Sequence, residues 1–117
     1  MSSGKAIAQA GHAYLDAMLA SLAVKDPKAD AYASLHPGTK ITLDGGSEAD
    51  LLRLRDKLAA RGIPHALIVD SGHVEMPDFD GSPTITALGV GPLTRSEARK
   101  LLSKWRLWGA PRKGGVP

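Results

Sequence analysis

The chain has no cysteine, few aromatic residues and no long apolar segment. Without cysteine it forms neither disulfides nor thiolate metal sites, a composition that suits a reducing cytoplasm. Because aromatic residues make up only 4% of the chain, we expect a core of Leu, Ile, Val and Ala. No apolar run approaches the ~20 residues that span a bilayer, so we expect a cytoplasmic protein with no membrane segment. A length of 117 residues fits one domain.

Positive charge is concentrated towards the C-terminus. From Thr94 onwards seven basic residues stand against Glu97 alone, so this part carries a net charge of +6 and the first 93 residues carry −3. A one-sided basic segment suggests an anionic partner, with nucleic acid as the first choice. On charge alone, a solvated helix face followed by a solubilising tail is the plainer explanation.

Helical and strand patterns alternate in the order α-β-α-β-β-α. Ser47 with Asp50, and Thr94 with Glu97, have the spacing of helix capping boxes. The segment 25–38 is predicted to form a loop or a short, poor helix, and the segment 74–83 is predicted to form a loop. The expected helices cover residues 5–23, 47–61 and 94–107, and the expected strands cover 39–43, 63–69 and 84–90. The unit 39–69 predicts two parallel strands joined by a right-handed crossover.

The first expected helix carries a polar stripe. At 100° per residue, Lys5, Gln9, His12 and Asp16 fall within about 60° of one another. A cation, a neutral hydrogen-bonding group and a possible proton carrier on one face would suit an ester or amide hydrolase. A solvated helix face explains the same spacing, so the pattern alone leaves both interpretations open.

Asp70 is the second candidate for chemistry. It follows the apolar run 66–69, and ligand sites in α/β proteins favour the carboxyl ends of strands. An Asp that caps a turn is the alternative.

His73 and Glu75 give only a weak metal signal, and we expect no metal site. The Gly-rich end of the last strand lacks the Lys-Ser/Thr of a phosphate loop, and no Ser lies in a Gly-x-Ser-x-Gly elbow.

Taken in order, these blocks resemble the archaeal and eukaryotic type of peptidyl-tRNA hydrolase, which also occurs in some bacteria. The resemblance runs over roughly residues 1–102. The matching blocks are Met1-Ser2-Ser3-Gly4-Lys5, Ala8-Gln9-Ala10-Gly11-His12-Ala13, Asp70-Ser71-Gly72 and Thr84-Ile85-Thr86-Ala87-Leu88-Gly89-Val90-Gly91-Pro92.

The resemblance implies a three-layer α/β/α fold with a small mixed β-sheet, three strands of which lie in this chain. It implies hydrolysis of the ester between a peptide and the 3′ ribose of tRNA, no cofactor, and often a homodimer. The positions that match the family's active site are Lys5, Gln9, His12, Asp70 and Thr86. We expect tRNA phosphates to contact Arg95, Arg99, Lys100 and Lys104. The domain would cover residues 1–108, and 109–117 would form a flexible basic tail.

Three departures from the family pattern leave a second interpretation open. The family's usual first strand, which precedes the Gly-Lys helix, is absent from this chain. Val74 stands where the family usually has Thr, so one hydroxyl group is missing. The loop 77–83 is slightly longer than usual. The alternatives are therefore a catalytically weak or inactive relative that binds tRNA or a protein, and a plain dimerisation module.

Overall fold

The computed structural model describes residues 2–35, 37–71, 74–75, 79–80 and 82–109 of the chain. The elements found there are α1 (Ser3–Ala23), α2 (Pro27–Ala33), α3 (Glu48–Ala60), β1 (His65–Asp70), β2 (Val74–Glu75), β3 (Phe79–Asp80), β4 (Thr84–Val90) and α4 (Arg95–Leu102). No helix in these ranges is both long and apolar enough to cross a membrane. His73 and the expected tail from residue 110 onwards lie outside the described residues.

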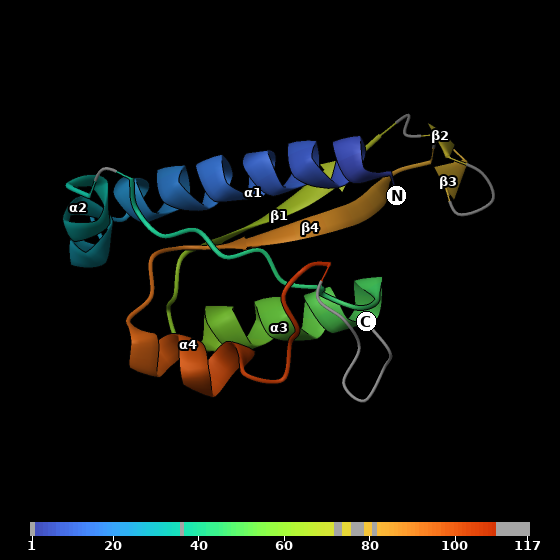
Figure 1. Ribbon diagram of the computed structural model, residues 1–117. Coiled ribbons are helices and arrows are strands. Elements are labelled where there is room, and N and C mark those ends of the chain that lie inside the picture. Colours follow the sequence, from blue (N-terminus) through green and yellow to red (C-terminus); the bar gives the residue numbers. More distant parts are fainter. Residues whose placement is uncertain (1, 36, 72–73, 76–78, 81, 110–117) are drawn as a thin grey trace.

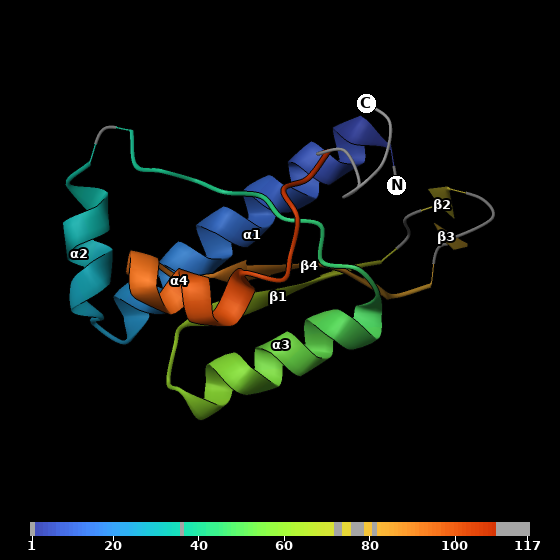
Figure 2. The ribbon, with the colours of Figure 1, turned by 60° about the horizontal axis from the view of Figure 1, so that its bottom comes forward.

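A two-stranded antiparallel sheet forms the middle of the molecule. β1 pairs with β4, from His65 opposite Val90 to Asp70 opposite Thr84. Helix α1 covers one face of this sheet, and α3 and α4 cover the other (Figures 1 and 2). The expected α/β class, with its three layers, is therefore confirmed. β2 and β3 form a separate short hairpin within the segment that the sequence analysis assigned to a loop.

The main core lies between the sheet and the layer of α3 and α4. Leu54 and Leu58 of α3 pack there with Ile63 and Leu101, and Leu58 is fully buried. Leu88 and Val90 of β4 pack against this cluster, together with Leu93, Leu102 and Trp105. The core is mostly aliphatic, as the shortage of aromatic residues led us to expect, and each fully buried side chain contributes about 1.5–3 kcal/mol.

Local capping chemistry begins α3 and α4 where the sequence predicts. Ser47 with Asp50 and Thr94 with Glu97 both form complete capping boxes. A hydrogen bond from the backbone N–H of Thr94 and, after it, one from the ammonium of Lys28 lower the pKa of the Glu97 carboxyl. The ion pair between Lys28 and Glu97 also ties α4 to the first turn of α2. Helix α4 ends at Leu102, five residues earlier than expected, because the chain turns there and brings Arg106 against Asp44.

The strand expected at 39–43, and with it the parallel pair and the mixed sheet, is wrong for the described residues. Only Leu43 forms a bridge, and it pairs with Leu107 beyond α4. The N–H of Asp44 donates to the Arg106 carbonyl at 2.8 Å, and that of Trp108 donates to the Thr42 carbonyl at 2.9 Å. A strand needs a continuous partner for its backbone groups. The segment 39–43 has only an irregular partner, the residues that follow α4. Its alternating sequence therefore does not by itself make it a strand.

Helix α1 lies unusually close to β4 at Gly89. A Cβ added to Gly89 would approach the carbonyl carbon of Ala13 to 2.8 Å and the Cβ of Ala17 to 3.0 Å, with the Ala13 carbonyl oxygen closer still. Ala13 and Ala17 are buried, so small side chains on the helix match the missing side chain on the strand. This contact sets the height of α1 above the sheet.

We expect Gly89→Ala to lower the free energy of unfolding by about 1–3 kcal/mol, because the added methyl group overpacks the helix–strand contact. Gly11→Ala is the matched control, since nothing lies within 4 Å of a Cβ added there. That change should raise the free energy by up to about 1 kcal/mol through helix propensity. Urea denaturation measures both, and a Gly89→Ala protein as stable as the wild type would contradict the close packing.

Candidate active site

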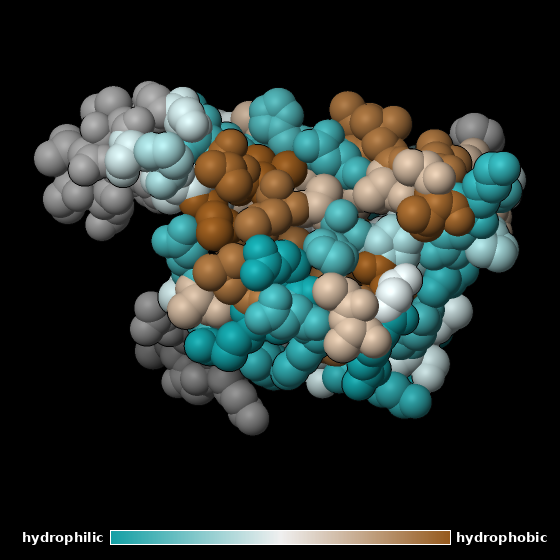
Figure 3. Space-filling model, turned by 180° about the vertical axis from the view of Figure 1, so that it is seen from behind, coloured by the Kyte–Doolittle hydropathy of each residue, from teal (hydrophilic) through white to brown (hydrophobic). Residues whose placement is uncertain are grey.

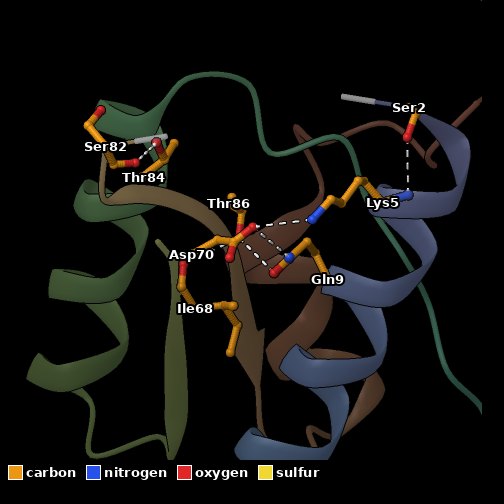
Figure 4. Close-up of polar contacts among 8 residues, drawn as sticks. All are labelled: Ser2, Lys5, Gln9, Ile68, Asp70, Ser82, Thr84 and Thr86. Atoms are coloured by element: carbon orange, nitrogen blue, oxygen red, sulfur yellow. Dashed lines mark hydrogen bonds and ion pairs between the residues drawn. The ribbon is translucent and has the colours of Figure 1, made fainter. Parts of the chain in front are cut away.

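Four polar side chains from three elements meet where β1 ends. Lys5 and Gln9 come from α1, Asp70 from the last position of β1, and Thr86 from β4 (Figure 4). Lys5 Nζ lies 3.7 Å from Asp70 Oδ2 in an ion pair. The Gln9 side chain contacts Asp70, 61 residues further along the chain, and Thr86, 77 residues further along. We call Lys5, Gln9, Asp70 and Thr86 the polar quartet.

Gln9 holds the polar quartet together. Its side chain is buried on the sheet side of α1, with 7% of the residue exposed. Its Nε2 donates to Asp70 Oδ2 at 3.4 Å, and its Oε1 accepts from Thr86 Oγ1 at 2.9 Å. Because both ends of the amide are used, its orientation is fixed and its burial is compensated. The solvated helix face considered for this stripe therefore does not describe Gln9.

A β-bulge aims Thr86 at α1. Ile68 pairs with Ala87 and Val69 with Ile85, so Thr86 is an extra residue in β4. In a regular strand, residues three apart face opposite sides of the sheet. Thr86 and Gly89 nevertheless both contact α1. The bulge thus turns the Thr86 hydroxyl away from the core of α3 and α4 and towards Gln9. No pattern in the sequence indicated it.

His12 lines an open groove beside the polar quartet rather than joining its hydrogen bonds. Its side chain is exposed, and the structure gives it no hydrogen bond or ion pair within the described residues. The groove has a volume of about 420 Å³. It is lined by Gln9, His12, Asp16, Leu67, Ile68, Val69 and Asp70. We call it the His12 groove. Of the five expected active-site residues, four are linked in one chain of polar contacts and the fifth borders the same groove.

The four cations expected to contact tRNA lie elsewhere. Arg95, Arg99 and Lys100 are exposed on α4, and Lys104 follows that helix with its ammonium 4.8 Å from the Trp105 ring centre. Helix α4 lies on the opposite face of the sheet from α1, beyond the end of β4 (Figures 1 and 2). The fold therefore does not bring these cations into the polar quartet.

Two of the family departures fall partly or wholly outside what the structure describes. Val74 begins β2, but its side chain is not described. Residues 77, 78 and 81 of the loop 77–83 are likewise undescribed. Among the residues that are described, no group of three or more His, Asp or Glu side chains is placed to hold a metal ion.

Comparison with known proteins identifies the family. A profile described as "Peptidyl-tRNA hydrolase PTH2" matches residues 1–108. The chain belongs to the peptidyl-tRNA hydrolase PTH2 family. The match includes α1, β1 and β4, and therefore all of the polar quartet.

Relatives of this chain include one eukaryotic and two archaeal proteins. A Dictyostelium discoideum protein named probable peptidyl-tRNA hydrolase 2 is 40% identical over 93 residues, which are 79% of this chain and 42% of that protein. Peptidyl-tRNA hydrolase of Pyrobaculum aerophilum is 34% identical over 93 residues, covering 79% of this chain and 76% of that one. That of Methanocaldococcus jannaschii is 29% identical over 107 residues, covering 92% and 89%.

In this PTH2 chain, the hydrogen bonds of the polar quartet run in one direction. Thr86 has a single hydroxyl hydrogen. It is shared between Gln9 Oε1 at 2.9 Å and the Ile68 carbonyl at 3.5 Å, and the shorter contact is the stronger. Thr86 therefore donates to Gln9, and Gln9 donates to Asp70. The Lys5 ammonium and the Gln9 amide N–H both face Asp70 Oδ2 at the edge of an open groove. In this arrangement the carboxylate can hold a water molecule, and the ammonium can stabilise a developing oxyanion.

We expect Thr86→Val to lower the free energy of unfolding by about 1–3 kcal/mol, because the buried Gln9 Oε1 loses its donor. Thr84→Val is the control, since the Thr84 hydroxyl donates to the Ser82 carbonyl in an exposed position. It should change stability by less than about 1 kcal/mol. Equal effects of the two substitutions in urea denaturation would contradict the special role of the Thr86–Gln9 bond.

Proposed function

We propose that the protein is a peptidyl-tRNA hydrolase that cleaves the ester between a peptide and the 3′ ribose of tRNA and so recycles the tRNA. The observation that carries the proposal is the convergence of Lys5, Gln9, Asp70 and Thr86, which come from three separate elements, at one open groove. Membership of the PTH2 family supports it. The chain spans 42% of the length of the Dictyostelium relative and 89% of that of the Methanocaldococcus one. The proposal therefore rests on residues present in this chain and not on the whole length of a relative.

Asp70 orients the attacking water in this mechanism. Its side chain is 23% exposed, which leaves it accessible from the groove, while Gln9 and Lys5 hold Oδ2. The water oxygen attacks the ester carbonyl carbon and gives up a proton towards the carboxylate. The bond between that carbon and the 3′ oxygen then breaks, and the 3′ oxygen takes up a proton. The products are a free peptide carboxylate and a tRNA with a 3′ hydroxyl.

Lys5 stabilises negative charge in the same reaction. Its ammonium is 46% exposed and projects from the first turns of α1 towards Asp70. It can therefore reach a carbonyl oxygen that becomes an oxyanion, or the phosphate next to the terminal ribose. Gln9 and Thr86 fix the position of Asp70, and His12 borders the substrate from the groove wall. The hydrolysis requires only water and these side chains, so the proposal includes no cofactor and no metal.

The homodimeric state and the cytoplasmic location belong to the same proposal. Support for a homodimer comes from apolar side chains that α1 leaves exposed, among them Leu15, Leu19 and Leu22. The face of the molecule seen from behind shows apolar patches separated by hydrophilic surface (Figure 3). A second copy could cover such patches. Sedimentation equilibrium would show the mass of the assembly.

We expect Lys5→Ala to lower kcat/KM for a defined peptidyl-tRNA about 100- to 1,000-fold, as the loss of one oxyanion donor does. Asp70→Ala should lower it about 100- to 10,000-fold through loss of the group that orients the water. The measurement is release of labelled peptide from the tRNA. Lys57→Ala on α3 is the matched control, because Lys57 is exposed and remote in the fold from the polar quartet.

Unchanged turnover in both variants would contradict the site assignment. A wild-type protein that binds tRNA but hydrolyses no peptidyl-tRNA would support the inactive, binding relative instead.

We also propose that the cations of α4 hold tRNA phosphates at a distance from the polar quartet. If both side chains contact phosphates, the double change Arg99→Ala with Lys100→Ala should weaken the salt dependence of tRNA binding. The slope of the logarithm of the association constant against the logarithm of the salt concentration should become shallower by about 1.4–1.8. The double change Lys57→Ala on α3 with Arg61→Ala at its C-cap is the control and should leave the slope unchanged. A slope that the α4 variant does not alter would remove this helix from the tRNA contact.

A further inference from the structure

The His12 groove continues along α1 past the polar quartet and ends at a carboxylate. Gln9, His12 and Asp16 all line it, and their spacings of three and four residues place them on one line along the helix. Leu67, Ile68 and Val69 of β1 form the other wall. Asp16 is exposed, and no hydrogen bond or ion pair engages it within the described residues.

Charge changes sign along this line. Lys5 lies near the N-terminus of α1, and the first turn of α1 holds no acidic residue. The N-terminal end of a helix carries a partial positive charge, which adds to that of Lys5. Asp16 lies eleven residues further on, at a rise of about 16 Å. An anionic phosphate chain is attracted to the Lys5 end and repelled by the Asp16 end. The ester has tRNA on one side and peptide on the other, so the tRNA extends towards Lys5 and the peptide towards Asp16.

We propose that the His12 groove binds the peptide part of the substrate and that Asp16 selects a positively charged group on that peptide. This inference rests on the proposed function. Leu67 and Val69 offer apolar contacts to a peptide's side chains, and the carboxylates of Asp16 and Asp70 in the same lining repel phosphates. From Gln9 to Asp16 the helix rises about 10.5 Å, and an extended peptide spans about 3.3–3.6 Å per residue. The cation that meets Asp16 is therefore on the third residue from the ester.

Two sources could supply that cation, namely the free α-amino group of a tripeptide and the side chain of Lys or Arg. Three substrates on one tRNA separate them. N-acetyl-Ala-Ala-Ala-tRNA carries no cation on its peptide, Ala-Ala-Ala-tRNA carries an α-ammonium group at pH 7, and N-acetyl-Lys-Ala-Ala-tRNA carries a side-chain ammonium group. The wild-type protein should hydrolyse at least one of the cationic substrates with a kcat/KM about two- to five-fold above that of the neutral one, the range of an exposed ion pair.

Asp16→Asn tests the carboxylate directly, because it removes the charge and keeps the shape. It should abolish the preference for cationic peptides, so that the cationic substrates are hydrolysed no faster than the neutral one. Asp16→Glu should retain the preference. Asp30→Asn makes the same chemical change on α2, outside the groove, and should leave the preference intact. The preference should also shrink as salt rises.

The failures of the two proposals can be told apart. A wild-type protein that hydrolyses none of the three substrates overturns the proposed function. Hydrolysis of all three at equal rates, unaffected by Asp16→Asn, leaves that function standing and overturns the role of Asp16. An Asp16→Asn protein that is slower on all three substrates by the same factor shows a structural role and also overturns the inference.

Discussion

The contact between α1 and β4 at Gly89 is the constraint on which the candidate site depends. With no side chain on the strand and only Ala13 and Ala17 on the helix, the two backbones come close enough for short polar side chains to meet. Gln9 lies one helical turn before Ala13, on the same side of α1. The same packing that fixes the height of the helix therefore brings the Gln9 amide within reach of the sheet.

The bulge at Thr86 and the burial of Gln9 are two halves of one arrangement. Helix packing alone would place Gln9 over the sheet with its Oε1 unpaired, a state that costs about 1–3 kcal/mol. A regular strand would direct the Thr86 side chain into the aliphatic core on the other face, where its hydroxyl group would have no side chain to hydrogen-bond with. The bulge satisfies both residues with one hydrogen bond, and it leaves the Gln9 Nε2 directed at Asp70.

The parts of the fold that follow from local chemistry were predictable from the sequence. The capping boxes at Ser47 and Thr94 lie within four residues of chain, and their positions were correct. The segment 39–43 failed because strand formation depends on a partner elsewhere, and local alternation carries no information about one. Polar residues such as Lys5 and Asp70 could be named from their spacing and the family resemblance. The bulge that aims Thr86 could not, because the register of a strand pair is a property of two strands together.

The hydrogen bond between Thr86 and Gln9 closes a loop of 77 residues, which is most of the chain. Helix α1 can form from contacts that are near in sequence, whereas this bond exists only when distant segments have docked. Contacts of high sequence separation form late in folding, because the entropy of loop closure must be overcome first. A compact intermediate could therefore possess the helix and the strands and still lack the arrangement at Asp70. In this molecule, catalytic competence and the completed long-range topology would arise in the same step.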